Sequence, residues 1–258
     1  MCRLFGLYAN RNVDVRFSFY KADKSFVEQS CKNPSGWGIA WFDGKRWNIY
    51  KEPRSLFQSR RAEELIRQVY GRIVVSHVRK ATRGGETMEN THPWLYRGWI
   101  FAHNGIIDEK RLFYLLKSEY RDLEGSTDSE RFFHLIIQEI DKLGDPIKGI
   151  KSAVDKVKYI EFSSLNFIAS DGKRLYALRY AAERENYYTL YYTERPGEPP
   201  LHKLSEETGQ LIEMKFAKGG KAVIIASECM TEENWRPIEN KHLVVVGEDL
   251  SLKSLDLS

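Results

Sequence analysis

Cys2 is the residue whose position offers the most specific chemistry in this sequence. Removal of Met1, which is usual before a small residue, would leave Cys2 with a free α-amino group beside its own thiol. The reference pKa of such an amine is about 8, so it can serve as a general base for the thiol. A cysteine at the start of a strand is also commonly a small buried hydrophobic residue. The position alone favours this structural alternative.

Two further segments carry groups that could bind or stabilise an anion. The segment 76–85 ends a β-branched run and enters a glycine-rich loop, where Arg79 could offer a bidentate fork to a carboxylate. An arginine lying over a sheet edge is the alternative. In His103-Asn104-Gly105, the side-chain amide of Asn104 and the backbone N–H of Gly105 could hold the oxyanion of a tetrahedral intermediate. Asn-Gly between apolar runs is equally typical of a hairpin turn.

An acidic residue and several histidines complete the candidates. Asp128 could bind a substrate ammonium, although an acid in the first turn of a helix is stabilised by the helix dipole whatever the function. The histidines show no ligand spacing, so we expect them to be packed or hydrogen-bonded; the ones considered are His77, His92, His103 and His134. The three cysteines also lack metal-ligand spacing, and no metal site is expected.

The order of the motifs is more specific than any one of them. It consists of Cys2, Arg79-Lys80-Ala81-Thr82-Arg83-Gly84, Thr91-His92-Pro93, His103-Asn104-Gly105 and Thr127-Asp128-Ser129-Glu130. In this order the chain resembles the glutaminase domain of class II glutamine amidotransferases, within the N-terminal nucleophile hydrolases. The resemblance is strongest to the stand-alone, YafJ-like members. It extends through Gly36-Trp37-Gly38-Ile39 and Asn234-Trp235-Arg236-Pro237-Ile238, and so covers essentially the whole chain.

The resemblance implies a role for each motif. Cys2 would be the nucleophile, with its own α-amine as the base. Asn104 and Gly105 would form the oxyanion hole. Arg79 would bind the α-carboxylate of the substrate, and Asp128 would bind its α-ammonium.

Three other positions bear on this expectation. Thr82 and His92 belong to the same motifs and are candidate substrate-binding residues. Lys80 stands where synthase-linked members of the family tend to carry an aromatic residue, which puts an aromatic gate for ammonia in doubt. Because the sequence ends at Ser258, soon after the last expected strand, we expect no synthase domain.

The implied reaction converts glutamine to glutamate and ammonia through a γ-glutamyl thioester on Cys2, with no cofactor. Three hypotheses stay open. The first is glutaminase activity, with ammonia supplied to a separate accepting protein. The second is hydrolysis of another γ-glutamyl amide or peptide. The third is a non-catalytic binding module of the same fold. A small-molecule substrate or ligand is common to all three.

Composition excludes several other classes of protein. The chain has 258 residues, of which 42% are hydrophobic, and 40 basic against 36 acidic residues give a net charge of +4. This even balance points to neither a nucleic-acid nor a membrane partner. No apolar run approaches the length of a bilayer span, and the N-terminus is too short in apolar residues for a signal peptide. With only three cysteines, we expect a cytoplasmic protein.

The remaining patterns predict the elements that must position these residues. Strands are expected at 3–8, 38–42, 47–51, 72–78, 98–102, 164–170, 175–179, 187–192, 211–216, 222–226 and 243–246. Helices are expected at 62–70, after the capping residues Asp108 and Thr127, and at 146–157, with a surface loop at 196–200. Strands at both ends with helices between them indicate α+β layers in one domain, 1–258. The resemblance implies a four-layer α/β/β/α sandwich of two mostly antiparallel sheets.

Overall fold

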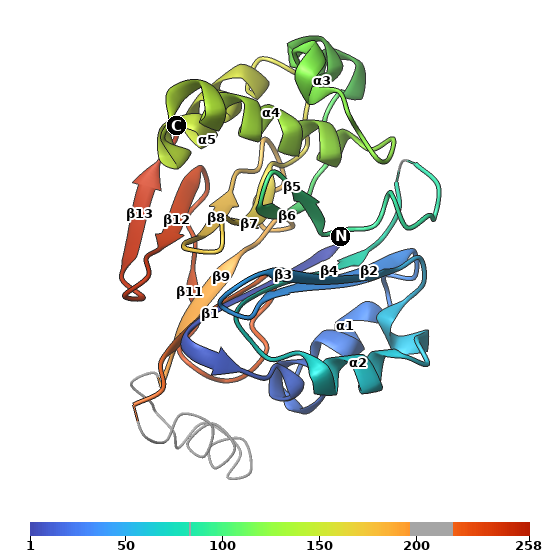
Figure 1. Ribbon diagram of the computed structural model, residues 1–258, viewed down its shortest axis with the longest axis vertical. Coiled ribbons are helices and arrows are strands. Elements are labelled where there is room, and N and C mark those ends of the chain that lie inside the picture. The colour runs from blue at the N-terminus through green and yellow to red at the C-terminus, as the bar shows by residue number, and fades with distance from the viewer. Residues whose placement is uncertain (83, 197–218) are drawn as a thin grey trace.

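The computed structural model describes residues 1–82, 84–196 and 219–258, and within them the chain forms two antiparallel sheets (Figure 1). The seven-stranded sheet has the order β11-β9-β10-β1-β4-β2-β3, and the six-stranded sheet has the order β13-β12-β8-β7-β6-β5. The first contains β1 (Arg3–Val13), β2 (Gly36–Phe42), β3 (Trp47–Glu52), β4 (Gly71–Arg79), β9 (Tyr191–Arg195), β10 (Ala222–Ala226) and β11 (Arg236–Pro237). The second contains β5 (Trp94–Tyr96), β6 (Trp99–Asn104), β7 (Asn166–Ser170), β8 (Leu175–Arg179), β12 (His242–Val246) and β13 (Leu252–Asp256).

Helices cover the outer face of each sheet (Figure 1). The six-stranded sheet is covered by α3 (Glu109–Leu115), α4 (Asp128–Leu143) and α5 (Pro146–Val157), and the seven-stranded sheet by α1 (Phe26–Ser30) and α2 (Ala62–Gln68). Short helical turns lie at η1 (Phe17–Lys21), η2 (Leu56–Gln58) and η3 (Ser118–Tyr120). The four layers confirm the expected α+β, α/β/β/α sandwich.

Alternating side chains of β1 show how the layers are joined. Leu4 and Tyr8 belong to the core between the two sheets, whereas Phe5, Leu7 and Ala9 belong to the core under α1 and α2. Successive side chains of a strand point to opposite faces, so a strand with apolar residues on both faces must lie inside the fold. The strand expected at 3–8 is confirmed as part of β1. Cys2 is the residue immediately before this strand.

The helix beginnings follow the expected capping chemistry, with one difference. The Asp108 carboxylate accepts from the backbone N–H groups of Lys110 and Arg111, and the Thr127 hydroxyl accepts from Glu130 N at 3.3 Å. The Glu130 carboxylate does not complete a reciprocal capping box. It accepts instead from the N–H groups of residues 124 and 125 in the preceding loop. The first turn of α4 is therefore tied to the chain that enters it.

Several expected elements need correction. The expected strand 187–192 is wrong, because residues 184–188 form a turn closed by a bond from Tyr187 N to Arg184 O, and β9 begins only at Tyr191. The sequence did not predict the short strands β5, β11 and β13 or the short helix α1. The expected strand 211–216 and residues 197–200 of the expected loop lie outside the described residues. The hairpin alternative for Asn104-Gly105 is also wrong, because β6 ends at Asn104 and the chain runs on through Gly105 to α3 instead of returning as a paired strand.

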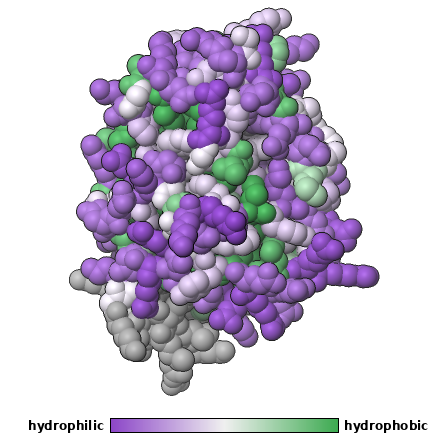
Figure 2. All heavy atoms as spheres, viewed as in Figure 1, coloured by the Kyte–Doolittle hydropathy of each residue, from purple (hydrophilic) through white to green (hydrophobic). Residues whose placement is uncertain are grey.

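The surface is that of an ordinary globular protein. The face drawn in Figure 2 is mostly hydrophilic, with small hydrophobic patches set among polar side chains. Among the residues that the structure describes, no helix combines the length and the apolar character needed to cross a bilayer.

Candidate active site

Strand register brings Cys2 to the loop that follows Arg79. β1 pairs antiparallel with β4, with Arg3 opposite Val78, so Cys2 comes beside the end of β4. The Lys80 backbone N–H donates to Cys2 Sγ at 3.2 Å, and the thiol reaches Lys80 O at 3.6 Å. Two motifs that are 78 residues apart in the sequence thus meet at one sulfur atom.

The surroundings of the Cys2 thiol favour its protonated form. Cys2 is half-buried, and burial raises the pKa of its thiol, opposed by the Lys80 N–H and by the charges of the N-terminal amine, Arg79 and Arg3. Met1 precedes Cys2 in this structure, so the free amine belongs to Met1, where burial lowers the pKa of the ammonium group. The thiol therefore needs an activating base to react near neutral pH.

Asn104 and Gly105 reach the same place from the other sheet. Asn104 is the last residue of β6, is almost fully buried, and donates from Nδ2 to the Cys2 carbonyl oxygen at 3.1 Å. A Cβ atom on Gly105 would lie 1.8 Å from the backbone oxygen of Ser164, closer than any real contact. Glycine is required at 105 by this close approach of two backbone segments, not by a hairpin turn.

Arg79 and Asp128 complete the group. Arg79 is buried at the end of β4 and donates from Nη1 to Gly85 O at 2.9 Å. Burial lowers the pKa of its guanidinium, opposed by the charges of Cys2, Glu86 and Asp128. Asp128, the first residue of α4, accepts from Ile107 N at 2.7 Å, two residues after Gly105. Arg79 thus lies within electrostatic reach of both the Cys2 sulfur and the Asp128 carboxylate.

Thr82 and His92 have surroundings unlike those of Cys2, Asn104 and Asp128. Thr82 is exposed in the loop after β4. The His92 ring is buried and packs between the rings of His77 and Trp94, with centroids 4.0 Å away on each side. A Cβ on Gly38 would lie 2.3 Å from His92 O, so glycine there allows the chain before Pro93 to pack against β2. Substrate binding by Thr82 and His92 stays a prediction.

The other histidines are packed or hydrogen-bonded, as expected. His103 Nε2 lies 3.2 Å from Ser164 O, which can only accept, so Nε2 carries the proton and the Ser129 hydroxyl donates to Nδ1 at 2.8 Å. Burial lowers the pKa of His103 to about 4. Burial, with a smaller contribution from the charge of Arg79, lowers the pKa of His77 to about 3. Both rings are neutral at pH 7.

These buried rings predict a loss of stability in acid. A histidine whose pKa is lower in the folded state binds its proton more readily when unfolded, so stability is complete above about pH 6.5 and falls as the pH drops below it. Each ring contributes a slope of about 1.4 kcal/mol per pH unit in that window. We expect His77→Leu to lose less unfolding free energy than the parent between pH 7 and pH 5, by on the order of 2 kcal/mol. Urea unfolding at both pH values measures this, and an unchanged difference would contradict it.

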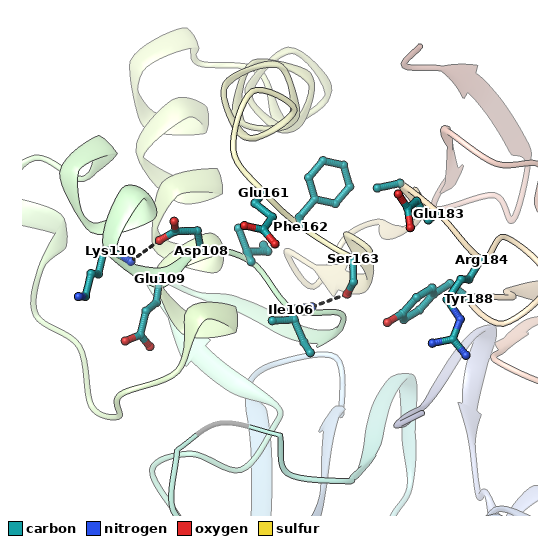
Figure 3. A pocket seen from close by; sticks show the side chains of 12 residues that line it. Ile106, Asp108, Glu109, Lys110, Glu161, Phe162, Ser163, Glu183, Arg184 and Tyr188 are labelled. Atoms are coloured by element: carbon teal, nitrogen blue, oxygen red, sulfur yellow. Dashed lines mark hydrogen bonds between the residues drawn. The ribbon is translucent and has the colours of Figure 1, made fainter.

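A groove opens beside Ile106, the residue after Gly105 (Figure 3). Its volume is about 690 Å³. Ile106 N donates to the Ser163 hydroxyl at 3.0 Å in its floor, and Phe162, Ala182 and Arg184 are among the other residues that line it. Cys2, Arg79, Asn104 and Asp128 do not line it. The groove is thus a neighbouring space, with room for a group larger than ammonia.

Sequence reasoning did not single out three contributors to this site. They are the Lys80 backbone N–H, the Arg3 side chain and Glu228, which pairs with Arg3 across 225 residues. A backbone donor and a pair so distant in sequence leave no local pattern, although an arginine beside Cys2 could have drawn notice. In the described ranges 1–82, 84–196 and 219–258, no group of three or more His, Cys, Asp or Glu side chains is arranged to hold a metal ion.

Comparison with known proteins adds relatives over most of the chain. The sequence profile described as "Glutamine amidotransferases class-II" matches residues 1–254. An uncharacterized protein of Methanocaldococcus jannaschii is 30% identical over 95% of this chain and 69% of its own length. The Escherichia coli protein named "Putative glutamine amidotransferase YafJ" is 29% identical over 73% of this chain and 76% of its own length.

The solved structures support the same fold. A glutamine aminotransferase class-II domain protein from Silicibacter pomeroyi superposes with a TM-score of 0.68 at 19% identity, covering 99% of both chains. The allosteric regulatory enzyme of purine biosynthesis superposes with a TM-score of 0.72 at 19% identity, covering 100% of this chain and 49% of that one. The N-terminal nucleophile hydrolase fold expected from the sequence is confirmed.

Proposed function

The chain belongs to the class II glutamine amidotransferases, and from this premise we propose that it hydrolyses the side-chain amide of glutamine to glutamate and ammonia. One observation carries the proposal. The ends of β1, β4 and β6 and the start of α4 place a thiol, a guanidinium, a side-chain amide and a carboxylate around one point. A thiol nucleophile, a carboxylate binder, an oxyanion donor and an ammonium binder are the groups that this reaction requires.

In the proposed mechanism, the Cys2 amine takes the thiol proton once Met1 has been removed. The thiolate attacks the side-chain amide carbon, and Asn104 Nδ2 and the Gly105 N–H stabilise the tetrahedral oxyanion. The C–N bond breaks, ammonia leaves with the returned proton, and a γ-glutamyl thioester remains on Cys2. Water then hydrolyses the thioester to glutamate.

Binding of the glutamyl end falls to the buried charges. Arg79 would hold the substrate α-carboxylate and Asp128 its α-ammonium, with Thr82 and His92 as further candidates. Charged partners in a partly buried site bind strongly because water competes less for them. Ammonia would pass to solvent or to a separate accepting protein. Three free thiols in the described residues support a reducing, cytoplasmic setting, and the shared core of both sheets supports a single domain.

Kinetics of two variants test the proposal. With glutamine as substrate and glutamate and ammonia as readouts, Asn104→Ala is expected to lower kcat by roughly 10²–10³, the usual loss for one oxyanion donor. Arg79→Ala is expected mainly to raise KM, because it binds a part of the substrate that does not react.

Asn166→Ala is the matched control for the first variant. Asn166 lies opposite Asn104 in β7 and makes structural bonds to Tyr180 N and Tyr188 O. It should lower the melting temperature and leave activity per folded molecule intact. The proposal fails if Asn104→Ala behaves like this control, losing stability while keeping its turnover.

A second candidate substrate is favoured by the groove beside Ile106. A γ-glutamyl peptide shares the glutamyl end with glutamine but releases a larger amine, and the groove of about 690 Å³ beside Ile106 can accommodate it. Both substrates use the same thioester chemistry. Only the leaving-group side distinguishes them.

Filling the groove separates the two candidates. Ala182 is exposed on the groove wall. Ala182→Trp is expected to lower kcat/KM for a γ-glutamyl dipeptide by at least about 10-fold, through steric exclusion, and to change kcat/KM for glutamine by less than about 2-fold. Parallel assays of both substrates measure this. If kcat/KM fell equally for both substrates, or fell for neither, the groove would have no role in substrate recognition.

A further inference from the structure

The side chain of Arg3 ties the N-terminus to a distant part of the chain. Its Nη1 donates to Met1 O at 2.9 Å and to Cys2 O at 3.4 Å, and its Nη2 forms an ion pair with the Glu228 carboxylate. The Arg3 side chain is only 18% exposed and that of Glu228 37%. The pair is therefore more shielded from water than a typical surface salt bridge, so its charges act more strongly on nearby groups.

Sheet register fixes Glu228 in this place. β10 pairs antiparallel with β1, with Ala226 opposite Phe5. The pairing continues one residue further, since Ser227 N donates to Leu4 O at 3.1 Å and Leu4 N donates to the Ser227 hydroxyl at 2.9 Å. Glu228 follows directly in the bend after β10, and its carboxylate reaches Arg3. The place of Glu228 is thus set by the strand pairing immediately before it.

We propose that Arg3 and Glu228 are a positioning pair for the N-terminal nucleophile. Arg3, together with Asn104, holds the carbonyl of Cys2, and Glu228 holds Arg3. The pair thereby keeps the amine of Cys2 beside its thiol once Met1 has been removed. The inference rests on the proposed function only in taking Cys2 as the nucleophile.

The pair also contributes two opposite charges near the N-terminal amine. Burial is the main cause that lowers the pKa of the Met1 amine; Arg3 on β1 and Lys80 after β4 lower it further, whereas the Cys2 thiolate and Glu228 after β10 raise it. Burial raises the pKa of the Cys2 thiol, and the charges of Arg79 and Arg3 lower it. A general base must be neutral to accept a proton. The charges of Arg3 and Glu228 act on this amine in opposite directions, Arg3 lowering its pKa and Glu228 raising it. After removal of Met1 the free amine is that of Cys2, one residue closer to Arg3, and we expect the same two charges to act on it in the same directions.

Variants of the two residues should therefore shift the pH profile in opposite directions. In protein with a verified Cys2 terminus, we expect Glu228→Gln to move the alkaline rise of Cys2 alkylation by iodoacetamide to lower pH. We expect Arg3→Met to move it to higher pH, each by on the order of half a unit. Arg3→Met should also lower kcat for glutamine by about 10-fold with KM nearly unchanged, because misplacement of reacting groups affects the chemical step. Arg3→Lys should restore part of the loss.

Arg97 and Asp141 supply the matched control. They form a second Arg–carboxylate pair, at 2.8 Å, between the β5–β6 turn and the far end of α4 from Asp128. Arg97→Met and Asp141→Asn should leave both the pH dependence of Cys2 alkylation and kcat for glutamine unchanged. A purely structural role for Arg3 and Glu228 would lower the melting temperature and leave the profiles in place.

The readouts separate this inference from the proposed function. Alkylation needs no substrate, so opposite shifts without any hydrolysis of glutamine would support the pair and overturn the function. Hydrolysis with unshifted profiles, or with shifts in the same direction, would overturn the pair and leave the function standing. Glu228→Gln keeps the shape of the side chain, so the test remains valid even if Arg3→Met does not fold.

Discussion

Replacing Cys2 with alanine is expected to abolish hydrolysis of glutamine, lowering kcat/KM by at least about 10⁴-fold. Without the sulfur, no thioester can form, and the groups around it have no nucleophile to assist. Release of ammonia and glutamate from glutamine measures the loss. A melting curve should remain close to that of the parent, since the Cys2 side chain is only half-buried and its hydrogen bonds to Lys80 involve a weakly bonding sulfur.

The other two cysteines are the matched controls. Cys31 is exposed and Cys229 is half-buried, and neither lies at the N-terminus. Cys31→Ala and Cys229→Ala should retain most of the activity. If Cys31→Ala were the inactive variant, the assignment of the nucleophile would be wrong. If the parent bound glutamine without turnover and Cys2→Ala bound it equally well, the non-catalytic module would be the better reading.

Much of the fold follows from the sequence because its core strands have apolar residues on both faces. β1, β4, β8 and β10 could be predicted without knowledge of their neighbours, because their consecutive apolar residues indicate a strand that is buried on both faces. The strands that were not predicted, β5, β11 and β13, lie at sheet edges, and β5 and β11 are also very short. Edge strands have one hydrogen-bonded neighbour and little apolar pattern, so their formation depends on the partner strand rather than on their own residues.

The candidate site shows the same division. The order of the motifs identifies five candidate residues: Cys2, Arg79, Asn104, Gly105 and Asp128. In the structure they lie at neighbouring ends of β1, β4 and β6 and at the start of α4. The reason for each residue was less predictable. Gly105 was equally compatible with a hairpin, and only the approach of the Ser164 carbonyl shows why no side chain fits. Such constraints arise between segments that are about 60 residues apart, where no local pattern records them.

The histidine at position 92 shows how a motif can place a residue without fixing its role. The sequence made His92 a candidate for substrate binding, and the structure buries its ring between His77 and Trp94. Arg79 lies close enough for its charge to lower the pKa of His92 further, after burial and the neighbouring histidines. These neutral rings therefore add no positive charge beside Arg79.

The second large effect that we expect concerns Met1. In the structure the nitrogen of Cys2 lies in a peptide bond, so it cannot accept a proton, and burial holds the thiol pKa above its usual range. Met1 is itself half-buried, and its carbonyl is bound by Arg3 at 2.9 Å. One peptide bond separates it from Cys2, so Met1 must occupy space beside the nucleophile. A protein that retains Met1 therefore lacks the base and has a crowded site.

We expect protein that retains Met1 to be at least about 100-fold less active on glutamine than protein from which an aminopeptidase has removed it, the usual effect of losing a general base. Intact-mass analysis establishes the N-terminus before and after trimming, and ammonia release is measured on both samples. Trimmed Cys2→Ala controls for activity that the aminopeptidase itself introduces. Equal activity with and without Met1 would rule out the α-amine as the base even if Cys2 remained the nucleophile, because the only change between the two samples is the one that frees this nitrogen.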